Sequence, residues 1–110
     1  MIEVIKKTIS STLLYEYQSI ILFGSRARGT NRLKSDYDIL IVLKDEVTEK
    51  EKIKITTKIR KSLAQKDIDA DILVKTKNEI DYFKNKMGSV VNIAIKEGVV
   101  LIKAKEFLEK

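Results

Sequence analysis

Two segments of this chain begin with a pair of aspartates and run directly into apolar residues. Residues Asp36–Leu43 and Asp69–Val74 are both rich in Ile, Leu and Val after their acidic start, which is typical of strands with a buried interior. Between them, Thr48–Gln65 is strongly charged and carries an apolar side at helical spacing. That side is formed by Ile53, Ile55, Ile59 and Leu63. The strand, helix, strand order predicts helices packed on a sheet.

The remaining segments extend the same pattern over the whole chain. We expect a helix from Ile2 to about Tyr17, a strand at Ser19–Phe23, a polar loop at Gly24–Ser35, helices at Lys77–Lys86 and Ser89–Glu97, a left-handed Gly98, and a last strand at Val99–Ile102. The prediction is an α/β (α+β) fold with a mixed sheet of about four strands. No linker or repeat interrupts the 110 residues, so we expect one domain covering residues 1–110.

Histidine and cysteine are both absent from the chain. Their absence excludes a Ser-His-Asp triad, imidazole metal ligands, disulfides and Cys-based zinc sites, and leaves carboxylates as the main catalytic and metal-binding candidates. Any bound metal is therefore expected to be a hard cation with oxygen ligands. The start of the chain lacks the order of a signal peptide and no apolar run approaches a bilayer-spanning length, so the expected location is cytoplasmic without membrane contact.

The acidic strand starts are the candidate metal site. In a strand, alternate side chains share a face, so Asp36 and Asp38 project from the same side about 6 to 7 Å apart. Asp71 directly precedes the next apolar run and could stand beside them across the sheet, whereas Asp67 and Asp69 are interpreted as solvated. Such carboxylates suit the paired Mg²⁺ ions of two-metal phosphoryl transfer. The alternative is a strand that starts in solvent with surface aspartates.

The loop after the first predicted strand is the candidate phosphate site. Gly24 lets backbone amides approach a phosphate closely, and the hydroxyl of Ser25 can add a donor. Basic side chains that can pair with phosphate oxygens follow in the same loop: Arg26, Arg28, Arg32 and Lys34. The alternative is a solvated basic turn that uses glycine only for its backbone geometry.

In combination these elements resemble a known superfamily. Gly24-Ser25, followed by Asp36-x-Asp38 and a later Asp71, is similar to the DNA polymerase beta-type nucleotidyltransferases. The run GSRARG…SDYDIL and the short length resemble the minimal nucleotidyltransferases, small prokaryotic proteins encoded beside a HEPN-domain partner. The resemblance extends from the first helix through KEGVVLI and implies the polymerase beta-like fold.

The resemblance also implies an activity and a set of partners. It implies that Asp36 and Asp38 bind two Mg²⁺ ions, with Mn²⁺ as the alternative, and that Asp71 joins at the metal that activates the acceptor hydroxyl. Gly24 and Ser25 would hold the triphosphate of ATP or another nucleoside triphosphate. Family members paired with HEPN toxins transfer AMP to a tyrosine of the toxin and act as antitoxins, which implies a hetero-oligomer with that partner.

Three other functions remain open at this point. One is transfer to a small hydroxylated molecule, as in aminoglycoside nucleotidyltransferases, although those enzymes usually carry a further helical domain. Another is a non-catalytic nucleotide-binding protein that neutralises its partner by contact. A template-independent RNA polymerase is favoured by the net charge of +6 but lacks an aromatic stacking platform, so nucleic acid is not the expected substrate.

Overall fold

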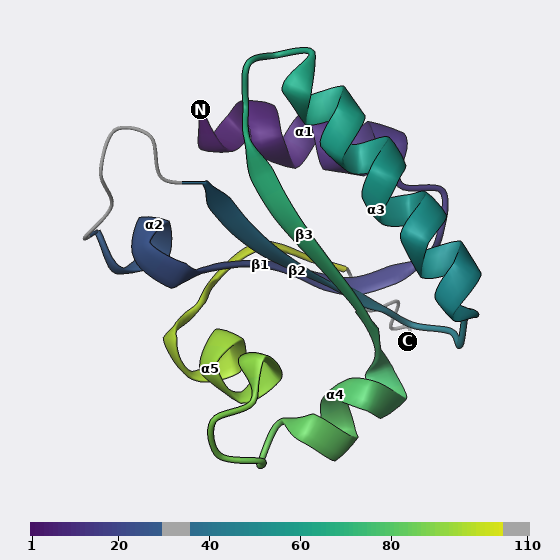
Figure 1. Cartoon of the computed structure of the whole chain (residues 1–110), viewed down its shortest axis with the longest axis vertical. Coiled ribbons are helices and arrows are strands. Elements are labelled where there is room, and N and C mark those ends of the chain that lie inside the picture. The colour runs from purple at the N-terminus through teal and green to yellow at the C-terminus, as the bar shows by residue number, and fades with distance from the viewer. Residues whose placement is uncertain (30–35, 105–110) are drawn as a thin grey trace.

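The structure, a computed structural model, describes residues 1–29 and 36–104. Its elements are α1 (Ile2–Thr12), β1 (Tyr17–Phe23), α2 (Gly24–Arg28), β2 (Tyr37–Leu43), α3 (Glu49–Ala64), β3 (Ala70–Thr76), α4 (Lys77–Phe83), α5 (Val90–Glu97) and β4 (Val99–Lys103), as Figure 1 shows. The predicted order of helices and strands is confirmed, with one addition: α2 stands at the start of the segment expected to be a loop. No helix of the described residues is long and apolar enough to cross a membrane.

The four strands form one mixed sheet in the order β3-β2-β1-β4. Strand β1 runs antiparallel to both β2 and β4, whereas β2 and β3 are parallel. This confirms the prediction of a mixed sheet of about four strands. Strands β3 and β4 are its edges, and β2 lies inside it.

Side chains from the two faces of the sheet enter two separate apolar clusters. On one face, Ile39 and Ile41 of β2 pack with residues of α1 and α3. On the other face, Leu40 and Val42 pack with residues of α4 and α5. All four side chains are buried, which explains why β2 is an uninterrupted apolar run and not an alternating one. Figure 1 shows the resulting layers, with α1 and α3 on one side of the sheet and α4 and α5 on the other.

Helix α3 begins with a capping box and turns the expected face inward, with one exception in its first turn. The Thr48 hydroxyl accepts a hydrogen bond from the backbone N–H of Glu51, whose carboxylate accepts one from the Thr48 N–H. The buried face is formed by Lys52, Ile55, Ile59 and Leu63. The prediction for Ile53 is wrong, because this side chain is 66% exposed. Lys52 takes the inward position since its ammonium group meets carboxylates there.

Helix α1 is shorter than predicted. It ends at Thr12, and Leu13 adopts an extended conformation with ψ of 117°. The Leu13 side chain is buried while Leu14 is 81% exposed, so the two leucines do not continue one helical stripe. Tyr17, the expected helix end, instead pairs with Leu43 in the sheet. Sheet pairing therefore overrides the local helical spacing of the apolar residues.

The prediction of a left-handed Gly98 is also wrong. Gly98 has a φ of −77° and an extended conformation. A Cβ atom there would collide with the carbonyl oxygen of Ala94 and with the side chain of Ile21, so glycine is required by close packing of the chain between α5 and β1. The left-handed glycine after a helix is instead Gly29, which ends α2 with a φ of 74°.

Candidate nucleotide and metal site

The turn between β1 and α2 lies directly against a carboxylate of β2. Phe23, the last residue of β1, pairs with Asp38. The chain then turns at Gly24 with a φ of 75°, in the left-handed region that favours glycine. A Cβ atom on Gly24 would collide with the carboxylate oxygen Oδ2 of Asp38. Glycine at this position thus serves both the turn and the close approach to the carboxylate.

Two of the three predicted carboxylates occupy matching positions on neighbouring parallel strands. Asp38 of β2 is in register with Asp71 of β3, so both side chains leave the sheet on the same face. Asp36 lies two residues before Asp38, just ahead of β2, and is exposed like Asp71. Asp38 is half-buried. The parallel pairing of β2 and β3 is what brings the two acidic strand starts to the same end of the sheet.

These carboxylates fit a hard divalent cation in donor chemistry and strand placement. Carboxylate oxygens are the ligands that Mg²⁺ and Mn²⁺ prefer. Within residues 1–29 and 36–104, however, no three acidic side chains converge closely enough to form a metal-binding group. The strand register places Asp38 and Asp71 on one face of the sheet, but no third carboxylate of the described residues lies close enough to complete a metal-binding group.

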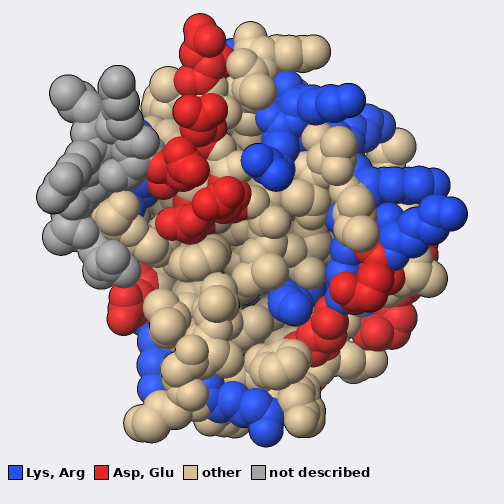
Figure 2. Space-filling model, in the orientation of Figure 1, with Lys and Arg blue, Asp and Glu red and all other residues tan. Residues whose placement is uncertain are grey.

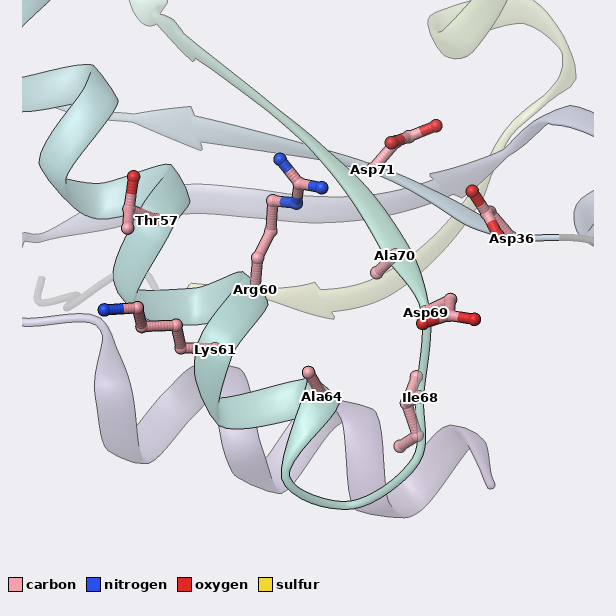
Figure 3. A pocket seen from close by; sticks show the side chains of 9 residues that line it. All are labelled: Asp36, Thr57, Arg60, Lys61, Ala64, Ile68, Asp69, Ala70 and Asp71. Atoms are coloured by element: carbon pink, nitrogen blue, oxygen red, sulfur yellow. The ribbon is translucent and has the colours of Figure 1, made fainter.

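A pocket of about 450 Å³ opens beside these carboxylates. Figure 3 shows Thr57, Arg60 and Lys61 on α3, to one side of β3, and the carboxylates of Asp69 and Asp71 extending from β3 on the side away from α3. The α3 residues are Thr57, Arg60, Lys61 and Ala64. Figure 2 shows the same contrast on the surface, with a band of acidic side chains next to lysine and arginine side chains. The pocket is therefore lined by acidic residues from the strand starts and by basic residues from α3.

The basic residues of α3 that line this pocket were not predicted from the sequence. Thr57, Arg60 and Lys61 recur at intervals of three and four residues, so they share one face of α3 that differs from its buried face. That spacing is visible in the sequence. The sequence does not show which strand this face meets, because α3 carries charged residues on every exposed side.

Arg26, a predicted phosphate-binding residue, has its guanidinium group over an aromatic ring. Its guanidinium carbon is 4.3 Å from the centroid of the Tyr37 ring, a cation–π distance. Tyr37 projects to the face opposite Asp38 and packs at the margin of the α1 and α3 cluster. The contact ties α2 to the first residue of β2. Of the other basic residues, Arg32 and Lys34 lie outside the described residues, as does the side chain of Arg28.

A buried ion pair holds α3 to α4 at the far end of β3. The Lys52 ammonium donates to Glu79 at 2.6 Å and to Glu49 at 2.7 Å. Burial alone would raise the pKa of Glu79, but hydrogen bonds from Lys52 and from the Thr76 N–H outweigh it and lower that pKa. Burial likewise opposes the charge of Lys52, yet its two carboxylate partners hold its pKa above the ordinary value.

Comparison with known families gives the architecture a name. The sequence matches the family described as polymerase beta, nucleotidyltransferase, over residues 3–107. The chain belongs to the polymerase beta nucleotidyltransferase family. The match includes both predicted aspartate pairs and the Gly24-Ser25 turn, and it confirms the expected fold class.

Individual relatives of this polymerase beta family member come from sequence and from structure. A Methanocaldococcus jannaschii protein, whose name proposes a protein adenylyltransferase, is 47% identical over 55 residues, which cover 50% of this chain and 56% of that protein. The crystal structure of a toxin–antitoxin with AMP-PNP superimposes with a TM-score of 0.64 at 22% identity, covering 94% of this chain and 74% of its own. A structure of a tri-AMPylated Shewanella oneidensis HEPN toxin with MNT antitoxin gives a TM-score of 0.56 at 19% identity, covering 94% and 74%. The two structural likenesses show the shared fold.

Proposed function

We propose that this chain is a divalent-metal-dependent protein adenylyltransferase. It moves AMP from ATP to the hydroxyl of a tyrosine on a HEPN-domain toxin and thereby acts as the antitoxin. The observation that carries the proposal is the packing of Gly24 against the Asp38 carboxylate, with Asp71 in register on the next strand. It supports the proposal because the candidate phosphate-binding turn and two candidate metal ligands lie at one end of the sheet.

The reaction breaks the phosphoanhydride bond between the α- and β-phosphates of ATP and forms a phosphodiester with the acceptor oxygen, whose hydroxyl proton is released to solvent. The acceptor oxygen forms a bond to the α-phosphorus of ATP in line with the bond that breaks, and pyrophosphate leaves. Gly24 and Ser25 hold the triphosphate through backbone N–H groups and the Ser25 hydroxyl. The acceptor approaches from the Asp71 side, because the Gly24 turn occupies the other side of Asp38. No histidine base is available in this chain.

Asp36, Asp38 and Asp71 would hold the metal ions. When bound, two Mg²⁺ ions supply the acidity that lowers the pKa of the acceptor hydroxyl and the charge that offsets the triphosphate. Charge balance requires them, since about −4 from the triphosphate meets three carboxylates in one place. Asp36 and Asp71 are exposed and can turn toward an arriving ion.

The comparisons support the acceptor and the partner. The matched archaeal relative carries a name that proposes protein adenylyl transfer. One structural neighbour contains an AMP-PNP-bound toxin–antitoxin, and another contains an AMPylated HEPN toxin with its MNT antitoxin. These relatives favour a protein acceptor over a small hydroxylated molecule.

The direct test is transfer of label from [α-³²P]ATP with Mg²⁺ to the HEPN-domain protein encoded beside this chain. We expect a labelled partner, loss of labelling with EDTA, and recovery with Mn²⁺. An unlabelled, intact partner would contradict the proposal. Labelling of a small hydroxylated compound without the partner would support the small-molecule alternative.

Substitution of the aspartates separates catalysis from simple binding. The double variant Asp36→Asn with Asp38→Asn should lose at least about 1000-fold in transfer, because the metal ligands are removed without a change in shape. Asp67→Asn is the matched control, since Asp67 is an exposed turn residue with a φ of 60° that Asn tolerates. Full inhibition of the partner by the double variant would show that binding alone neutralises it.

A further inference from the structure

A continuous groove follows the outer edge of β3 away from the carboxylates. A second pocket of about 340 Å³ lies between α3 and residues 72–75 of β3. It shares Thr57 and Arg60 with the pocket beside Asp71. The two pockets therefore form one groove, bounded by α3 along one side and by β3 along the other. Figure 1 shows β3 and α3 next to each other at this edge of the sheet.

The strand that bounds the groove has a free backbone edge within the described part of the chain. β3 pairs with β2 alone and is the last strand of the sheet on that side. The Tyr37 N–H donates to the carbonyl of Asp69, so Asp69 and Asp71 turn their backbone groups toward β2. By alternation, the N–H and C=O groups of Ala70, Ile72 and Val74 point outward. Such an edge accepts an extended segment as an additional strand.

The lining of the groove favours a polypeptide over a nucleic acid. Away from the carboxylates, its lining includes apolar side chains that are not fully buried and suit peptide side chains: Ile53, Ile72 and Leu73. Ile53 is 66% exposed there, an exposure that core packing does not explain. No aromatic side chain on which a base could stack lines either pocket in the described residues.

The cations of the groove favour an acidic occupant. Arg60 and Lys61 form no ion pair with any described residue. Lys52, in contrast, is already paired with Glu49 and Glu79. Arg60 lies where the two pockets meet and so next to any segment that runs from the groove to Asp71.

We infer that this groove binds the acceptor segment of the partner protein. The segment adds to the edge of β3 as an extended strand, presents its hydroxyl beside Asp71, and places an acidic side chain against Arg60 and Lys61. The inference rests on the proposed function for its acceptor, but the docking mode can be tested by itself. It assigns selection of the protein substrate to α3 and β3, apart from the nucleotide-binding turn at Gly24.

The test combines kinetics with amide hydrogen exchange, using this chain and the HEPN-domain protein encoded beside it. Partner binding should slow exchange of the outward Ile72 and Val74 amides. Arg60→Glu should raise the KM for the partner at least about tenfold and leave the KM for ATP unchanged, because a charge-assisted contact to the acceptor is lost. Lys58→Glu makes the same charge change on the opposite side of α3, where Lys58 lines a different pocket, and should change neither constant.

Each outcome distinguishes docking from chemistry. Slowed exchange along β3 without labelling of the partner supports the groove and contradicts adenylyl transfer. Labelling with unchanged exchange along β3, or with an unaltered partner KM in Arg60→Glu, overturns the groove and leaves the proposed function standing. Protection of the same amides by a single-stranded RNA oligonucleotide, and not by the partner, also overturns it.

Discussion

Two glycines of this chain share an unusual backbone conformation but differ in what surrounds them. Gly24 and Gly29 both have φ near 75°, at the start and the end of α2. Space for a Cβ atom is open at Gly29, whereas at Gly24 it is taken by the Asp38 carboxylate. Substitutions at these two glycines therefore distinguish the effect of a strained left-handed backbone from the effect of displacing a candidate metal ligand.

We predict that Gly29→Ala lowers the free energy of unfolding by about 1 kcal/mol and largely retains transfer activity, because only the backbone is strained. Gly24→Ala should have a similar stability cost but lose about 100-fold or more in activity, since Asp38 has to turn away from its place. Chemical denaturation and AMP transfer by both variants check this. Equal activity of the two variants would contradict a role for the Gly24–Asp38 contact.

The residues of the site differ in how far the sequence could predict them. Asp36, Asp38 and Asp71 stand out because each precedes a run of apolar residues and alternation alone puts the first two on one face. Arg26 was a phosphate candidate only by its place in a basic loop, and its guanidinium lies over the Tyr37 ring. A side chain that long reaches several partners, so its sequence position does not determine which one it meets.

At the scale of the elements, one ion pair joins three of them. Lys52 on α3 reaches Glu79 on α4, and Glu79 also caps α4 by accepting from the Thr76 N–H at the end of β3. The Lys52 and Glu79 side chains are 11% and 27% exposed, so water screens the pair only in part. The pair fixes the end of β3 that lies farthest from the carboxylates.

We predict that Lys52→Met lowers the free energy of unfolding by about 1 to 2 kcal/mol at neutral pH. The pKa of Glu79 is lowered from its ordinary value of 4.5, so its contribution is complete above pH 4.5 and is lost as the pH falls through the lower folded pKa. The pKa of Lys52 is raised from 10.5, so its contribution is complete below pH 10.5 and is lost as the pH rises further. The wild type and variant should therefore converge at both extremes.

Urea denaturation of both proteins from pH 3 to pH 8 measures the acidic side of this effect. Lys84→Met is the matched control, because its pair with Asp81 is 46% and 55% exposed and should contribute at most about 0.5 kcal/mol. A difference between wild type and Lys52→Met that stays constant through the acidic range would contradict the assigned pair.

Element types were predictable where the apolar pattern was long, and element ends were not. The burial of β2 on both faces follows from its unbroken apolar run. The end of α1 did not follow from its pattern, because Leu13 and Leu14 continue the helical spacing in sequence while only Leu13 enters the core. Three of the four residues predicted for the inward face of α3 are buried, and the fourth was wrong because Lys52 takes the inward position in place of Ile53.

For the whole molecule, the sheet separates two apolar clusters and β2 contributes to both. Ile41 enters the cluster with α1 and α3, and Leu40 the cluster with α4 and α5. Both are fully buried, whereas Val100 on the edge strand β4 is 53% exposed. Stability should therefore depend on both layers and little on the outer face of β4.

We predict that Ile41→Ala and Leu40→Ala each lower the free energy of unfolding by about 3 kcal/mol, because each leaves a cavity in a closed cluster. Val100→Ala should cost less than about 1 kcal/mol. Thermal or urea unfolding monitored by circular dichroism checks all three. A small effect of Leu40→Ala beside a large effect of Ile41→Ala would show that the α4 and α5 layer contributes little to the fold.

The sequence by itself determined the chemistry that this protein has available. Without histidine or cysteine, its reactive groups are carboxylates and cations, and the two Asp-x-Asp strand starts were recognisable because burial pattern and charge are local properties of a strand. Only the tertiary structure decided which groups face one another. The parallel register of β2 and β3 paired Asp38 with Asp71, close packing required Gly24 beside Asp38, and the placement of α3 along β3 put Arg60 in the pocket that Asp36 and Asp71 also line. Those contacts join residues far apart in the chain, and no local pattern records the packing that brings them together.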